Sequence, residues 1–339
     1  MHFWPRTPIT FKFKTKEANI MADKKTSFGY LLPTREAIMA PAEPDFASMI
    51  NLAETAERQG FESVWVGDSI LARPRLEALT TLAAIAGRTS RVKLGTAVYL
   101  PALRNPVILA NEIANLDIIS NGRVILGVGI ASKTQAVQNE FAACGVDFRY
   151  RVSIFEETIS IMQKLWTEEQ VSFNGRHFQL DAVNPGLKPV QKNGIPIWMA
   201  ASAEKPQRRM LKIGDGWFPN SRSPQAFTKS WQDIESLAKQ SGDDSARLHK
   251  ALYTTLNINN NKAQADKEMR EFIEGYYNMP FETMAQTQSV FTGNGTEVQS
   301  WLKDFIDAGA ETVVIRFGGP DQSGQLEQFS NEVLPAILG

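Results

Sequence analysis

The chain has 339 residues, of which 43% are hydrophobic and 22% are charged, a composition typical of a globular protein with a sizeable core. Its net charge of −1 gives no electrostatic reason to expect binding to nucleic acid or to an anionic membrane surface. The single cysteine, Cys144, excludes an intramolecular disulfide and a cysteine-clustered metal site, and fits a reducing, cytoplasmic location. No apolar run in the sequence reaches the length of a membrane span.

The N-terminal end differs from the rest of the chain. The first 20 residues hold four lysines and arginines against one acid and lack the apolar core of a secretory signal. A second methionine, Met21, precedes the first predicted strand. We therefore predict a disordered extension over residues 1–26 and a single domain over residues 27–339, with a targeting peptide as the alternative for the extension.

From Phe28 onward, short apolar strands alternate with helical stripes. Eight strands, each followed by a helix, predict an α/β fold of the (β/α)8 TIM-barrel type, with a doubly wound open sheet as the alternative. Three connections are longer than usual and predict lids or substrate walls at the carboxyl ends of the strands, with peripheral decoration of the barrel as the alternative: residues 130–152, 168–194 and 258–296. The predicted strands lie near residues 28–32, 62–67, 92–99, 123–128, 196–200, 215–219, 249–257 and 312–317.

The stretch from Arg91 to Gly129 reads as strand, tight loop, helix and strand. Asn105 and Pro106 predict the N-cap and first residue of the helix. Both strands end in small residues, at 95–97 and 127–129, where a flat or phosphorylated ligand can approach the backbone closely. We therefore predict a binding floor there. The helix between the strands carries one apolar stripe, formed by Ile108, Leu109, Ile113, Leu116 and Ile119.

The residues give little support to hydrolytic chemistry. The three histidines, at positions 2, 177 and 249, have no metal-binding spacing, and no Gly-x-Ser-x-Gly motif occurs, so no metal site is predicted. A reaction carried by a cofactor fits better, because the protein then supplies shape and dipoles rather than strong acids or bases. Ser132 stands where a dinucleotide fingerprint needs its third glycine, which disfavours a Rossmann nucleotide domain.

Several short motifs, in their order along the chain, resemble the bacterial luciferase-like family of flavin-dependent oxidoreductases (luciferase-like monooxygenases). The likeness covers roughly residues 27 to 338, and it rests on the ordered set rather than on any one motif. The motifs are Val64–Asp68, Leu94–Thr96, Arg104–Pro106, Leu116–Asp117, Ser120–Arg123, Leu126–Gly129, Phe155–Glu157, Leu165–Trp166, Lys188–Gln191, Ile195–Trp198 and Asp215–Phe218.

This resemblance implies where a flavin lies. It places the flavin ring against the end of the third strand, over a non-prolyl cis peptide, with the end of the fourth strand beside it. It places the flavin phosphate at a small-residue turn that leads into a helix N-terminus, although close strand–helix packing also explains that turn. The implied cofactor-binding residues are Thr96, Ala97, Val98, Gly129, Ile130, Ala200, Ala201 and Ser202.

The chain also departs from the family pattern. The family commonly has a histidine after the second strand, where this chain has Asp68 and Ser69, which become the candidate catalytic residues because they can position a substrate or bond the flavin edge. No carboxylate follows the fourth strand directly. Glu77 either caps the next helix or contacts a ligand, and Arg104 either reaches the site or pairs on the surface.

The leading functional prediction is a flavin-dependent monooxygenase that uses reduced FMN, supplied by a separate reductase, and molecular oxygen to oxidise a small organic substrate. The alternatives are a deazaflavin-dependent reductase or dehydrogenase of the same family, a non-catalytic flavin-binding protein, and a barrel isomerase or aldolase. Fold alone does not separate them. A homodimer is predicted from small apolar helix faces, with packing against the barrel as the alternative explanation: Ala83, Ala84, Ala86, Ala110 and Ala114.

Overall fold

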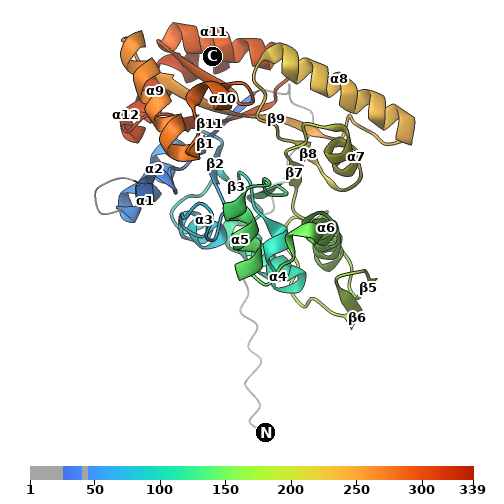
Figure 1. Ribbon diagram of the computed structural model, residues 1–339. Helices are drawn as coiled ribbons and strands as arrows, with labels where there is room; N and C mark the ends of the chain where they lie inside the picture. The colour runs from blue at the N-terminus through green and yellow to red at the C-terminus, as the bar shows by residue number, and fades with distance from the viewer. Residues whose placement is uncertain (1–25, 40–44) are drawn as a thin grey trace, which may run out of the picture.

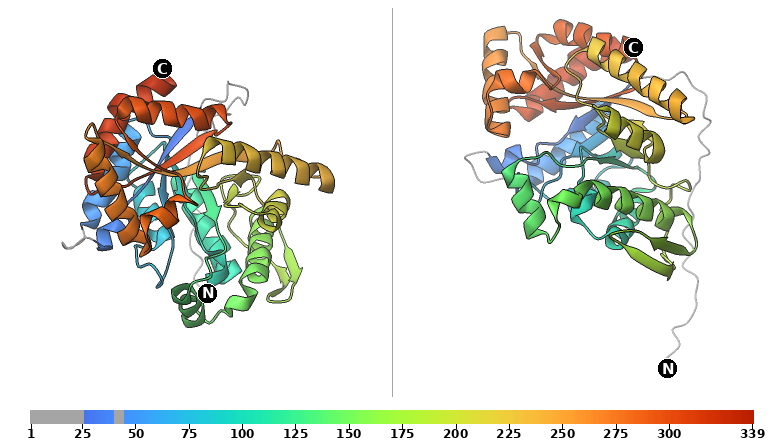
Figure 2. Two further views of the ribbon diagram at one scale, coloured as in Figure 1. Left: turned by 45° about the horizontal axis from the view of Figure 1, so that its top comes forward. Right: turned by 45° about the vertical axis from the view of Figure 1, so that its right-hand side comes forward.

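The computed structural model describes residues 26–39 and 45–339. Figure 1 shows helices arranged around a central set of strands, and Figure 2 shows the same arrangement from two further directions. Residues 1–25 of the predicted extension lie outside the described residues. No helix in the described part of the chain is long and apolar enough to cross a membrane.

Eight parallel strands form a closed barrel. Each strand pairs with the next along the chain, β8 pairs with β9, and β11 pairs back with β1, so the ring has no open edge. This confirms the predicted TIM barrel over the open sheet, and all eight predicted strands are present. The barrel strands are β1 Ser27–Leu31, β2 Ser63–Val66, β3 Lys93–Thr96, β4 Val124–Val128, β7 Ile197–Met199, β8 Gly216–Trp217, β9 His249–Ile258 and β11 Thr312–Phe317.

Helices cover the outside of the barrel, because each crossover between parallel strands returns along the outer face. The crossover and C-terminal helices are α2 Phe46–Arg58, α3 Ala78–Ala86, α4 Pro106–Ser120, α6 Arg151–Thr167, α7 Glu204–Ile213, α8 Pro224–Ser241, α11 Gly295–Asp307, α12 Gln322–Gln328 and α13 Leu334–Leu338. Shorter turns of helix occur at Glu36–Met39 (α1), Pro101–Leu103, Phe148–Tyr150 and Phe329–Val333.

The three long connections contain further elements. The first forms α5 (Gln135–Ala143), the second a hairpin of β5 (Val171–Asn174) and β6 (Gln179–Val183), and the third α9 (Lys262–Tyr277), α10 (Phe281–Ala285) and β10 (Val290–Gly293). The hairpin is fastened to α6, because the Glu157 carboxylate accepts hydrogen bonds from the backbone amides of residues 176–178.

Helix α4 confirms one prediction and corrects another. The Asn105 side chain caps it by accepting from the amides of residues 107 and 108, and Pro106 is its first residue. Three members of the predicted stripe are buried, but Ile108 and Ile119 are 59% and 60% exposed. The buried face instead includes the small residues Ala110 and Ala114, which let the helix pack closely against the barrel and α6.

The alanines from which a dimer was predicted divide between interior and surface. Three of the five are buried within the single chain, which is what packing against the barrel requires, while Ala83 is half-buried and Ala84 is exposed. The homodimer therefore stays a prediction. The three buried alanines are Ala86, Ala110 and Ala114.

Aromatic side chains fill the inside of the barrel. Trp65 contacts Trp198 and Phe218, with ring centroids 5.3 and 5.1 Å apart. The Trp65 ring occupies the space where Gly95 lacks a side chain, and a Cβ on Gly127 would overlap the carbonyl oxygen of Thr96. These two glycines, predicted as part of a ligand floor, thus serve packing inside the protein.

Candidate active site

A cavity of about 200 Å³ lies at the carboxyl ends of the barrel strands. Its walls come from the β2–α3 loop, the end of β3, the segment after β4, the helices α5 and α9, and β9. The first and third long connections contribute lining residues, and the hairpin of the second contributes none. The lining residues are Asp68, Ser69, Ala72, Arg73, Arg75, Ala97, Val98, Leu100, Ala131, Ser132, Val137, Glu140, Tyr253, Tyr276 and Tyr277.

The end of β3 forms the floor of this cavity. Ala97 and Val98 line it, and the peptide bond between them is cis, at the position where the family resemblance implied one. Gly129 lies against this floor, since a Cβ there would come within 2.6 Å of Cγ2 of Val98. Thr96 is buried below, and its hydroxyl donates to the carbonyl oxygen of Gly127 at 2.7 Å. Ile130 is half-buried beside Gly129 and does not line the cavity.

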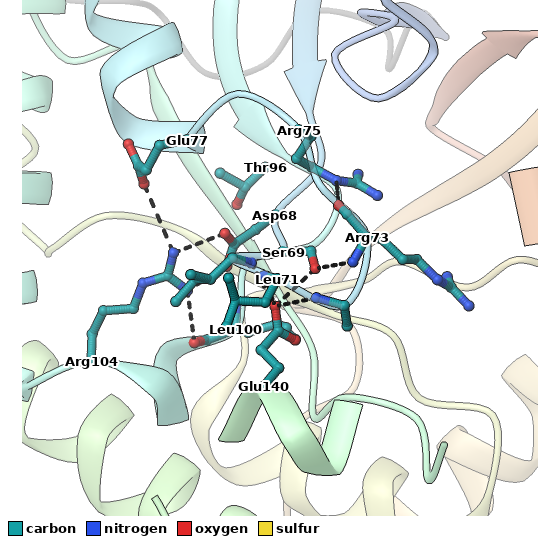
Figure 3. A network of polar contacts seen from close by, with 12 residues as sticks. Asp68, Ser69, Leu71, Arg73, Arg75, Glu77, Thr96, Leu100, Arg104 and Glu140 are labelled. Carbon is teal, nitrogen blue, oxygen red and sulfur yellow. Dashed lines mark hydrogen bonds and ion pairs between the residues drawn. The ribbon is translucent and has the colours of Figure 1, made fainter. Parts of the chain in front are cut away.

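Asp68 is held by an ion pair. Arg104 donates from Nη1 to Oδ2 at 2.5 Å and from Nη2 to Oδ1 at 2.8 Å, and the Leu100 amide donates to Oδ2 at 2.9 Å (Figure 3). Burial disfavours the charged form of Arg104, but the hydrogen bonds and charge of Asp68 outweigh that effect and raise the pKa of the guanidinium. Both carboxylate oxygens are thus engaged in fixing the backbone after β3. Glu77 accepts from the Thr80 amide at 2.7 Å, so it caps α3.

Ser69 belongs to a second network, organised by Glu140 on α5. Glu140 Oε1 accepts from Ser69 Oγ at 2.9 Å and from the amides of Ile70 and Leu71 at 2.6 and 2.7 Å. Ser69 Oγ in turn accepts from the Arg73 amide at 2.9 Å. Glu140 is 1% exposed, and its Oε2 has no hydrogen-bond partner. The carboxylate therefore fixes the loop that carries Ser69, from an element 71 residues away.

Sequence reasoning missed Glu140. A signal was present, because Val137, Glu140 and Phe141 share one face of a short helix by their spacing, and that face is buried. A carboxylate on an otherwise apolar face is rarely buried without a partner. The tyrosines of the far wall, Tyr253 and Tyr276, carried no comparable signal, since only barrel closure brings β9 and α9 to this cavity.

The predicted phosphate turn lies at the end of β7, outside the cavity lining. Ala201 is buried and its carbonyl oxygen accepts from Trp217 Nε1 at 2.9 Å, whereas Ala200 and Ser202 are exposed. Helix α7 then begins after Ala203 without a side-chain cap. Its first-turn amides have no partner within the helix, which suits a phosphate group. The arginines that follow are engaged elsewhere: Arg208 pairs with Glu204 and Arg209 with Glu156.

A second cavity, of about 630 Å³, lies between α1, α2 and α9 and shares Tyr276 with the first. Its walls are formed largely by helices and include the acids Glu36, Asp45, Glu268 and Glu271, which disfavour an anionic, phosphate-tailed cofactor. Within residues 26–39 and 45–339, no group of three or more metal-ligating side chains is arranged to hold a metal ion.

Comparison with known proteins is consistent with this geometry. Residues 26–316 match the family described as luciferase-like monooxygenase. The chain is 28% identical over 320 residues to an F420-dependent glucose-6-phosphate dehydrogenase of Amycolatopsis mediterranei, covering 85% of this chain and 94% of that protein. Two solved structures share the fold: an F420-dependent secondary alcohol dehydrogenase (TM-score 0.78, 21% identity, 92% and 99% of the chains covered) and a monooxygenase from Streptomyces bottropensis (TM-score 0.76, 21% identity, 91% and 99% covered).

Proposed function

The chain belongs to the luciferase-like monooxygenase family, and we propose that within this family it is an oxidoreductase that works with the deazaflavin coenzyme F420. The choice of F420 over FMN rests on the relative named as F420-dependent, because this chain is similar to it over nearly its whole length. This choice favours the alternative stated from the sequence over the leading prediction of an FMN-dependent monooxygenase. When bound, F420 supplies or accepts a hydride, which needs neither molecular oxygen nor a separate flavin reductase.

The residues present fit such a cofactor. The floor is made of the small residues Ala97 and Val98, with Gly129 beside it, so a flat ring can approach the backbone there. The exposed turn at Ala200 and Ser202, followed by the uncapped start of α7, offers amide donors to a phosphate. The Glu140 network holds the Ser69 loop rigid at the cavity wall, which favours fixed placement of a substrate.

Cofactor titration tests the proposal. Oxidised and reduced F420 and FMN are each added to the protein without oxygen, and the dissociation constants are measured from the cofactor absorbance and fluorescence. We expect F420 to bind at least about 10-fold more tightly than FMN. If reduced FMN binds more tightly than F420 and substrate oxidation requires oxygen, the protein is a flavin-dependent monooxygenase instead. Tight binding without turnover would indicate a binding protein.

A charge variant tests the phosphate turn. Ser202→Asp places a carboxylate at the exposed turn, so we expect about 10-fold weaker F420 binding through repulsion of the phosphate. Ser236→Asp adds the same charge to an exposed position of α8 and serves as the matched control. Equal F420 affinities for the two variants would show that the phosphate does not bind at this turn.

A further inference from the structure

Arg316 on β11 is a buried cation without an ionised partner close by. It is 2% exposed and lies two residues after Val314, on the same inward face of the strand. Nε and Nη2 both donate to the hydroxyl of Thr255, at 3.2 and 2.9 Å, and Nη1 has no hydrogen-bond partner. The acid Glu36 acts on the charge of Arg316 without a hydrogen bond between the two. Burying a charge in this way is unfavourable for stability, so a functional reason is called for.

Aromatic rings surround this guanidinium. Its carbon lies 4.5 Å from the centre of the Tyr276 ring, and 5.4 and 5.5 Å from those of Tyr277 and Tyr253. Burial raises the pKa of the Tyr253 hydroxyl well above its ordinary value, so that phenol stays neutral and does not cancel the charge. The three tyrosines line the active-site cavity, and Arg316 therefore stands directly behind their wall.

Two further arginines lie at the cavity itself. Arg75 packs against Gly67 at the end of β2 and donates from Nη2 to the Tyr276 hydroxyl at 3.2 Å. The Arg73 guanidinium lies 5.2 Å from the centre of the Tyr277 ring. Figure 3 shows both side chains extending to the same side, away from Arg104. Both arginines line the cavity, and each guanidinium lies against a tyrosine ring.

Acidic groups offset these charges only in part. Asp68 is paired with Arg104, whereas Glu140 lies on the opposite α5 wall with Oε1 bound by the Ser69 loop and Oε2 without a hydrogen-bond partner. Glu36 is the remaining acid whose charge acts on Arg316 and Arg75; burial raises its pKa, against the attraction of these two arginines. The wall formed by α9, β9 and the β2–α3 loop is therefore positively charged.

We propose that Arg73 and Arg75 bind an anionic group of the substrate, a carboxylate or a phosphate, with Arg316 as a positioning residue whose charge acts from behind the tyrosine wall. A guanidinium offers a planar set of donors that matches either group, and hydrogen bonds between charged partners are the strong ones. Arg75 lies beside the Ala97–Val98 floor, since a Cβ on Gly67 would overlap Nη1 of Arg75 and would lie 3.8 Å from the carbonyl oxygen of Ala97. The assignment of the anion to the substrate, with the cofactor on the floor, rests on the proposed function.

Anion binding tests the inference without any cofactor. Inorganic phosphate and benzoate are titrated calorimetrically into the protein at constant ionic strength. We expect Arg73→Met and Arg75→Met each to weaken binding by about 10-fold or more. Arg149→Met is the matched control, because Arg149 is exposed and pairs with Asp147 outside the cavity. Equal binding in all variants, or no binding of either anion, would overturn the inference.

Two further experiments test whether the charge of Arg316 contributes to anion binding and whether the anion belongs to the substrate or to the cofactor. Arg316→Lys keeps the charge and is expected to bind anions within about 3-fold of the unaltered protein, whereas Arg316→Met is expected to lose about 10-fold. Similar losses of anion affinity in both variants would indicate a purely structural arginine. If Arg316→Met does not fold, the Arg73 and Arg75 variants still decide.

Repeating the titration with protein saturated with F420 should leave the benzoate affinity intact. Displacement of benzoate by F420 would assign the arginines to the cofactor and overturn the substrate site.

Discussion

Asp68 and Arg104 form a two-point ion pair that ties the end of β2 to the segment between β3 and α4. The side chain of Asp68 is 1% exposed and that of Arg104 is 15% exposed, so water screens the pair weakly. The Arg104 guanidinium also lies 4.2 Å from the centre of the Tyr99 ring. Asp68 is therefore a fixed part of the rim rather than a free acid.

Breaking this pair should destabilise the fold. Asp68→Asn leaves the buried Arg104 without its counter-charge, and we expect a loss of about 3 kcal/mol in the free energy of unfolding, measured in urea. Glu54→Gln, which breaks the exposed pair with Arg88, should lose less than about 1 kcal/mol. A loss for Asp68→Asn no larger than for Glu54→Gln would contradict the structural role of the pair.

Glu140 should govern the mobility of the Ser69 loop. Glu140→Gln replaces a charged acceptor of three close hydrogen bonds by a neutral amide, so we expect about 1–3 kcal/mol of destabilisation and faster hydrogen exchange at Ile70 and Leu71. The parallel variant Glu157→Gln should speed exchange at residues 176–178 and leave the Ser69 loop unchanged. Unaltered exchange at Ile70 and Leu71 in Glu140→Gln would refute the assignment.

The proposed cofactor floor should be sensitive to one methyl group. Gly129→Ala places a Cβ 2.6 Å from Cγ2 of Val98, so this side chain must move into the space above the floor. We expect F420 affinity to fall about 10-fold with little change in the melting temperature. Gly87→Ala is the control, because the nearest atom to its Cβ is 3.6 Å away. Normal F420 binding by Gly129→Ala would place the ring elsewhere.

Glu57 should contribute stability that depends on pH. Burial opposes its charged form, but hydrogen bonds from the amides of Val92, Arg91 and Ser90 outweigh burial and lower its pKa. A lowered pKa in the folded state gives stability that is present above the unfolded value, about 4.3, and is lost as the pH falls through the folded value. We expect Glu57→Gln to be less stable by about 1 kcal/mol at pH 7, and we expect this difference in the free energy of unfolding to shrink steadily as the pH is lowered below about 4.3, measured by urea unfolding at a series of pH values.

The sequence by itself determined the elements and their order. Strand and helix periods are local properties, so the eight strands and the Asn105 cap of α4 could be predicted. The cis peptide bond between Ala97 and Val98 was implied by the family resemblance. Barrel closure followed from the alternation, because eight strand–helix units of this length form a TIM barrel. The motifs and their order along the chain are also properties of the sequence itself, so they could indicate the family before the fold was known.

Tertiary structure alone decided which side chains meet. The pairing of Asp68 with Arg104, the capture of the Ser69 loop by Glu140 and the placement of Arg316 behind Tyr276 join residues far apart in sequence. Packing also decided that Trp65 fills the space beside Gly95 and that Ile108 faces solvent. These outcomes depend on how strands stagger and helices rotate when the barrel closes, and the one-dimensional pattern of apolar residues does not specify either quantity.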